Sequence, residues 1–102
     1  MKEMPADTLY GKFFFHPADP VYEQHFPGSP VVPGSLIIKA FLRAMSELGY
    51  DCAEVVLQGF RFKKFVKPGS YDYQLQLSED KVYCSLKSNN LEYVSGVIAN
   101  AQ

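Results

Sequence analysis

His25 and Lys39 are the two side chains of this sequence whose types and setting suggest proton-transfer chemistry. They lie in the stretch HFPGSPVVPGSLIIKAF, residues 25–41, where a histidine framed by proline and glycine precedes an apolar run containing one lysine. An imidazole, whose ordinary pKa is ~6.5, accepts a proton near neutral pH. A lysine ammonium, whose ordinary pKa is ~10.4, is a weak acid unless burial lowers that pKa. The two groups can cooperate only if the fold brings them to one cavity.

A proline-rich loop and a helix must position these groups. Residues 16–34 hold five of the seven prolines, which favours a shaped loop because proline fixes φ and lacks an N–H. Residues 35–48, SLIIKAFLRAMSEL, are predicted to form a helix with Ser35 as its N-cap and Gly49 as its stop. The helix is apolar enough to require burial on more than one side, and its polar residues fall in one narrow stripe: Lys39, Arg43, Ser46 and Glu47.

The other elements are predicted to be strands, because apolar and polar residues alternate between turn signals. Antiparallel strands that follow one long helix predict an α+β fold, in which the sheet curls around the helix. The uncovered flank of the helix and the free edge of the sheet would favour pairing with a second subunit. The predicted strands cover residues 8–15, 54–66, 71–77, 81–87 and 91–99, with Pro68-Gly69 ending the second.

Composition narrows the class of protein. The 102 residues predict a single domain, 1–102, and 47% apolar residues with 15% aromatics predict a globular one. A net charge of −1 argues against general nucleic-acid binding. Cys52 and Cys84 lack metal-ligand spacing, and no apolar run has the length of a secretory signal or a membrane span. We expect a soluble cytoplasmic protein with reduced cysteines, no membrane association, no metal and no cofactor.

The motif HFPGSPVVPGSLIIKA resembles the signature of the FabA/FabZ-type 3-hydroxyacyl-[acyl-carrier-protein] dehydratases, roughly H-F-P-G-x-P-x-x-P-G-x-L-x-x-E-A. The stretch FRFKKFVKPGS, residues 60–70, resembles a second segment of that family, and the likeness extends over residues 13–99. The resemblance implies a hot-dog fold and a dimer of like or unlike chains with acyl tunnels at the interface. It also implies a substrate thioester on phosphopantetheine, from acyl-carrier protein or coenzyme A, in fatty-acid or polyketide chemistry.

The resemblance also implies roles for individual residues. His25 would remove the proton on Cα, and backbone N–H groups at Gly34 and Ser35 would face the thioester carbonyl. That second role has a physical reason, since free N–H groups at a helix N-terminus stabilise a developing enolate. The substrate-binding residues implied by the motif are Phe26, Pro27, Gly28, Pro33, Gly34 and Ser35.

Lys39 departs from the family pattern, because it stands where the family has the glutamate that protonates or orients the departing hydroxyl. Lys39 either lines the tunnel or belongs to a solvated stripe with Arg43 and Glu47. Glu47 is ~12 Å further along the helix and too far to replace the missing acid. Asp19, Glu23 or a partner subunit could supply one instead. A cation beside His25 would also depress the pKa of that imidazole.

Other candidate side chains have plainer interpretations. His16 has no motif support and is predicted to be a loop or core histidine, and Ser29 a turn residue. The aromatic run Phe13–Phe15 is predicted to serve core and interface, with tunnel lining as a second option. The basic run is either a solvated strand face or a docking patch for an acidic carrier protein; it consists of Arg61, Lys63, Lys64 and Lys67.

Three functions remain open. The first is a 3-hydroxyacyl-thioester dehydratase of the hot-dog type, either active or with altered or impaired activity. The second is a non-catalytic subunit that binds acyl or carrier groups within a hot-dog heterodimer. The third is an acyl thioesterase, which is disfavoured because the helix offers no carboxylate at the expected place.

Overall fold

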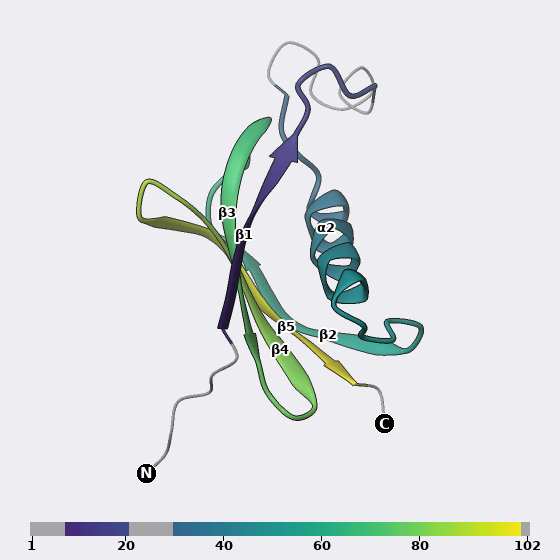
Figure 1. The fold of residues 1–102 in the computed structure, drawn as a ribbon. Helices are drawn as coiled ribbons and strands as arrows, with labels where there is room; N and C mark the ends of the chain where they lie inside the picture. Colours follow the sequence, from purple (N-terminus) through teal and green to yellow (C-terminus); the bar gives the residue numbers. More distant parts are fainter. Residues whose placement is uncertain (1–7, 21–29, 101–102) are drawn as a thin grey trace.

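The computed structural model describes residues 8–20 and 30–100. Within these ranges the chain forms five strands and one helix, in the order predicted from the sequence (Figure 1). All neighbouring strands are antiparallel, and their order in the sheet is β1-β3-β4-β5-β2. This is the hot-dog arrangement. The elements are β1 (Thr8–Phe15), α2 (Gly34–Glu47), β2 (Val55–Phe62), β3 (Gly69–Leu77), β4 (Lys81–Ser88) and β5 (Leu91–Asn100).

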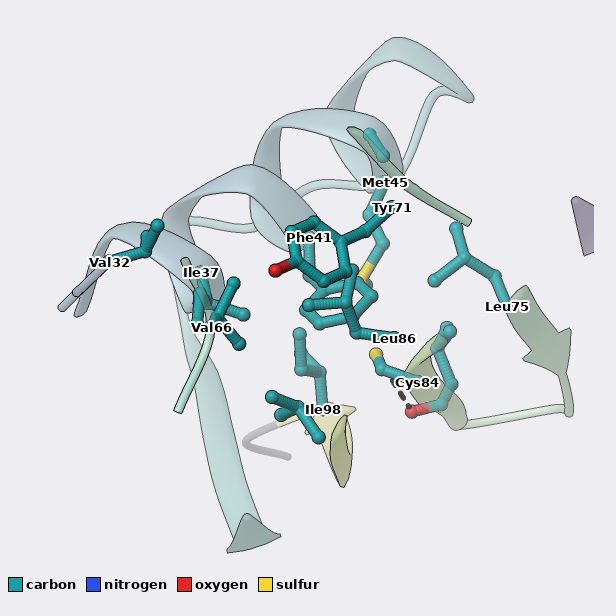
Figure 2. Close-up of a cluster of buried hydrophobic side chains, with 13 residues drawn as sticks. Val32, Ile37, Phe41, Met45, Val66, Tyr71, Leu75, Cys84, Leu86 and Ile98 are labelled. Carbon is teal, nitrogen blue, oxygen red and sulfur yellow. Dashed lines mark hydrogen bonds between the residues drawn. The ribbon is translucent and has the colours of Figure 1, made fainter. Parts of the chain in front are cut away.

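The core lies between one face of α2 and the middle strands. Ile37, Phe41, Ala44 and Met45 are the buried residues of the helix, which recur at helical spacing. Phe41 has no exposed surface and lies between the helix and the sheet (Figure 2). The strands contribute a fully buried apolar layer that includes Leu75, Val82, Leu86, Val94 and Ile98. Burial on one face of the helix alone leaves the opposite face free to form a site.

The ends of α2 differ in how well the sequence predicted them. The N-cap is Pro33 and not Ser35: Pro33 is extended, with φ −62° and ψ 145°, and its carbonyl accepts the N–H groups of Leu36 and Ile37. Ser35 therefore lies inside the first turn, and the prediction was wrong because the backbone carbonyl at Pro33 starts the helix without a side-chain cap. Gly49 ends the helix as predicted, with φ +98° and an N–H bonded to the Ser46 carbonyl.

Strand β2 is shorter than predicted, ending at Phe62. A bulge at Gly59, with φ +60°, shifts the register against β5, and the Lys63 N–H makes the last bond to that strand. The chain then leaves the sheet to bury Val66, whose carbonyl accepts the N–H of Val32. Pro68 precedes β3 and does not end β2. The turn between β4 and β5 is a two-residue turn, with positive φ at both of its asparagines, 89 and 90.

Among the described residues, β1 and β2 form the two edges of the sheet and neither has a strand paired on its outer side. On β2, Val56, Leu57 and Phe62 are 43–47% exposed, so this edge is long and apolar. The opposite edge, β1, carries Lys12, which forms an ion pair of 2.7 Å with Asp72 on β3. Across the described ranges, no helix has the length and apolar character needed to cross a membrane.

Candidate active site

A cavity of about 570 Å³ lies between α2 and β1. Its size falls within the range of small-molecule sites, ~300–1,000 Å³. One wall comes from the helix, one from the end of β1 and the turn that follows, and Tyr73 of β3 completes it. The helix contributes Leu36, Lys39, Ala40, Arg43, Ala44 and Glu47, and the β1 side contributes Lys12, Phe13, Phe14, Phe15, His16 and Asp19.

Aromatic rings form the apolar part of this cavity. Phe13 stacks on Tyr73 with ring centroids 4.3 Å apart, and its other contacts are edge-on, to Phe15 at 6.1 Å and to Phe41 at 5.3 Å. Phe13 and Phe15 are half-buried, whereas Phe14 is 62% exposed. The run therefore joins the core to the cavity wall, and the option of cavity lining holds together with the core role.

The polar stripe of α2 forms the facing wall. Lys39, Arg43 and Glu47 are exposed and follow one another at intervals of one turn, and all three line the cavity. Within the described part of the chain, none of the three forms an ion pair. The solvated stripe is thus itself one wall of this cavity.

His16 lies at this cavity, although no motif marked it as a site residue. Its Nδ1 accepts the N–H of Ala18 at 3.0 Å, and its ring meets Phe14 edge-on at 5.5 Å. Because Nδ1 accepts, the neutral imidazole held this way carries its proton on Nε2. Asp19, one of the alternative acids considered from the sequence, is at the same cavity. One feature of the sequence could have marked His16 as a site residue: it directly follows the aromatic strand and begins a turn that contains proline.

The residues of the motif are only partly described. His25, Phe26, Pro27 and Gly28 fall outside the described residues, as do Glu23 and Ser29. Pro33, Gly34 and Ser35 form the start of α2. The N–H groups of Gly34 and Ser35 have no acceptor within the described residues, so they remain available at the positive end of the helix.

Gly34 is tightly covered by an aromatic ring from β2. A Cβ atom at this position would lie 3.0 Å from Cζ of Phe62, closer than side chains normally approach. Phe62 in turn stacks on Phe60 at 6.3 Å. The glycine of the motif thus allows the last residue of β2 to pack on the helix start, beside the available N–H groups.

Comparison with known proteins bears directly on this arrangement. A family model described as ApeI-like, ApeI dehydratase, matches residues 2–97. The chain belongs to the ApeI-like dehydratase family. Among its relatives are proteins named 3-hydroxyacyl-[acyl-carrier-protein] dehydratase FabZ. The one from Thiobacillus denitrificans is 37% identical over 62 residues, covering 50% of this chain and 43% of the relative. That from Chloroflexus aggregans is 37% identical over 73 residues, covering 64% and 51%.

A third FabZ relative, from Shewanella woodyi, is 35% identical over 75 residues, with 64% of this chain and 49% of the relative covered. This ApeI-like chain therefore spans about half the length of the curated relatives it matches. Membership in the family confirms the resemblance read from the HFPG motif.

The basic run of this ApeI-like chain is divided between two structural settings. Arg61 is exposed on β2, whereas Lys63, Lys64 and Lys67 follow the strand. Lys63 forms an ion pair with Glu92, and that hydrogen bond lowers the pKa of the Glu92 carboxyl. The backbone of Lys67 holds the Tyr71 hydroxyl, with its N–H donating at 3.0 Å and its carbonyl accepting at 2.8 Å. The four residues do not form one uninterrupted strand face, and carrier docking there stays a prediction.

Proposed function

We propose that this ApeI-like chain acts on 3-hydroxyacyl thioesters carried by a pantetheine arm, as a dehydratase in which a lysine replaces the usual acid. The observation that carries the proposal is the position of Lys39. It stands at the acid position of the family motif and lines an aromatic-walled cavity on α2.

The proposed reaction is a β-elimination. His25 removes the proton on Cα, and the negative charge that develops on the thioester oxygen is stabilised by the N–H groups of Gly34 and Ser35. The electron pair of the broken C–H bond then forms the Cα–Cβ double bond as the Cβ–O bond breaks. The imidazolium of His25 gives the proton taken from Cα to the departing oxygen, which leaves as water, and His25 returns to its neutral form.

We further propose that a second hot-dog chain, identical or different, pairs along the free edge of β2. The exposure of Val56, Leu57 and Phe62 on this edge supports the proposal, since a long apolar edge strand invites further strand pairing. A non-identical partner could also bring the acid that this chain lacks. In that case the present chain is the degenerate half of a heterodimer, which is the second candidate function.

A single coupled assay separates the candidate functions. The purified chain is incubated with 3-hydroxyacyl N-acetylcysteamine thioesters, and enoyl absorbance and free thiol are followed together. Enoyl product supports the dehydratase, and free thiol a thioesterase. Absence of turnover together with binding of the acylated carrier supports the non-catalytic subunit. Dehydration that survives the substitution His25→Ala would remove the proposed base from the mechanism.

The proposed interface is tested by solution mass. Leu57→Lys places a charge on the free edge of β2, whereas Gln76→Lys places the same charge on an exposed position of β3, away from that edge. Light scattering coupled to size exclusion should give a dimer for the wild type and the control, and a monomer for Leu57→Lys. A dimer for both variants would place the interface elsewhere.

A further inference from the structure

Lys39 and Arg43 are two neighbouring cations on the cavity wall. They lie one helical turn apart, a spacing at which side chains are neighbours and like charges repel. The third cation of the lining, Lys12, is occupied by Asp72 at 2.7 Å. Within the described residues Lys39 and Arg43 have no acidic partner. An anion bound between them would be attracted by both cations and would offset their mutual repulsion.

The acidic residues of the lining limit where such an anion could bind. Glu47 is one turn beyond Arg43, and Asp19 lies on the turn after β1. An anion is therefore favoured between Lys39 and Arg43 and disfavoured at the C-terminal end of the helix. Opposite these cations, Phe13, Phe15 and Tyr73 offer an apolar surface. The cavity thus suits a ligand with an apolar body and one negatively charged end.

The distance along α2 indicates which end of a thioester carries that charge. In the proposed reaction the thioester carbonyl is held at the helix start, near Gly34. Lys39 and Arg43 are five and nine residues further on, or ~7 Å and ~13 Å along the axis at 1.5 Å per residue. In this proposed binding mode the acyl chain would extend from the carbonyl into the cavity, and the phosphate of the pantetheine arm would lie on the other side of the thioester. The cations therefore face the acyl end.

We propose that this site selects acyl thioesters whose chain ends in a carboxylate, held between Lys39 Nζ and the Arg43 guanidinium. The inference rests on the proposed function, since it names the substrate class of that same site. A glutamate at position 39, as in the family motif, would repel such a chain end, whereas Lys39 attracts it. The charge at one helix position thereby sets substrate selection.

Binding of matched probes to the full chain tests this selection. Suberyl N-acetylcysteamine thioester and its monomethyl ester differ in the terminal charge and in one methyl group, and neither carries a phosphate. The wild type should bind the free acid at least about tenfold more tightly than the ester, the ratio expected for one charge-assisted hydrogen bond. Lys39→Glu should invert the ratio and Arg43→Gln should reduce it. Lys81→Gln, on β4 and outside this cavity, is the matched control and should leave the ratio unchanged.

Several outcomes would overturn the proposal. Equal affinity for acid and ester in the wild type is one, and a preference that persists in Lys39→Glu is another. A third is a preference for 4′-phosphopantetheine over pantetheine that Lys39→Glu abolishes, since the cations would then hold the phosphate. The proposed function is judged separately, by enoyl formation from a neutral 3-hydroxyoctanoyl thioester. Turnover of that neutral substrate without any carboxylate preference would defeat only the inference, and carboxylate selection without turnover would defeat only the proposed function.

Discussion

Lys39→Glu places a carboxyl on the cavity wall, and under the proposed function it should increase dehydration of neutral 3-hydroxyacyl thioesters. The exposed position of Lys39 on α2 makes the exchange compatible with the fold. A positioned acid or base typically contributes ~10²–10⁴-fold in rate. This corresponds to ~3–5 kcal/mol of barrier at ~1.4 kcal/mol per factor of ten.

Arg43 sets where in this range the gain should fall. It lies one turn from position 39, and its cation favours the ionised form of a carboxyl placed there. An ionised carboxylate can orient the hydroxyl but cannot protonate it, so we expect a gain near ~10²-fold for Lys39→Glu alone. Combining it with Arg43→Gln removes the cation and should raise the gain further. The substitution Arg43→Gln by itself should give no increase.

The substitution Lys39→Glu should also stabilise the folded protein slightly. It replaces a like-charge pair at i,i+4 by an acid followed by a base, the favourable orientation, so the free energy of unfolding should rise by ~0.5–1 kcal/mol. Urea unfolding measures this change in the free energy of unfolding, and the initial rate of enoyl formation measures the activity separately. A folded Lys39→Glu variant with no more activity than the wild type would refute the view that only one group is missing from an otherwise complete site.

Three further predictions concern the fold that supports the site. Phe41→Ala should lower the free energy of unfolding by ~3–5 kcal/mol in a urea titration, because Phe41 is fully buried in the centre of the core. Gly96→Ala should cost ~1–3 kcal/mol, since its Cβ would lie 2.4 Å from the Phe60 ring, whereas Gln76→Ala on an exposed position should be nearly neutral. Burial raises the pKa of the Cys84 thiol from 9.0 to about 12, so the unfolded chain loses this proton first. Stability should therefore be unaffected by this thiol below pH ~9 and fall from there towards pH ~12. At pH ~10 the free energy of unfolding of the wild type should have fallen by ~1.4 kcal/mol more than that of Cys84→Ala. Equal pH profiles of stability for the wild type and Cys84→Ala would contradict this prediction.

The sequence was informative about the fold wherever a local pattern and a tertiary contact agreed. In YDYQLQL, residues 71–77, apolar and polar side chains alternate, and in β3 Tyr71 and Leu75 are buried while Asp72 and Gln76 are exposed. The pattern failed where a non-local contact decided the outcome. Phe65 and Val66 favour a strand by residue type, but Val66 leaves the sheet to enter the core, and its carbonyl accepts the N–H of Val32. No local periodicity encodes that bond.

The candidate site could be predicted only in part, because here too local patterns do not encode non-local contacts. The motif identified position 39, and its spacing from the helix start is a property of the helix itself, so Lys39 could be assigned to α2. His16 could not be assigned to the site, because its place beside the helix depends on how β1 pairs with β3 and on the turn held by Ala18 N–H. The stacking of Phe13 on Tyr73 likewise joins residues that are distant in sequence.

The two proposals about Lys39 predict opposite effects of the single substitution Lys39→Glu: a gain in turnover of neutral substrates and a loss of affinity for charged ones. If Lys39 marks a missing acid, Lys39→Glu raises the turnover of neutral substrates. If Lys39 and Arg43 also hold a carboxylate at the chain end, the same variant loses affinity for charged substrates. A protein that gains one property while losing the other would have exchanged catalytic power for selectivity at a single helix position. Because α2 buries only its opposite face, that exchange requires no change in the core beneath it.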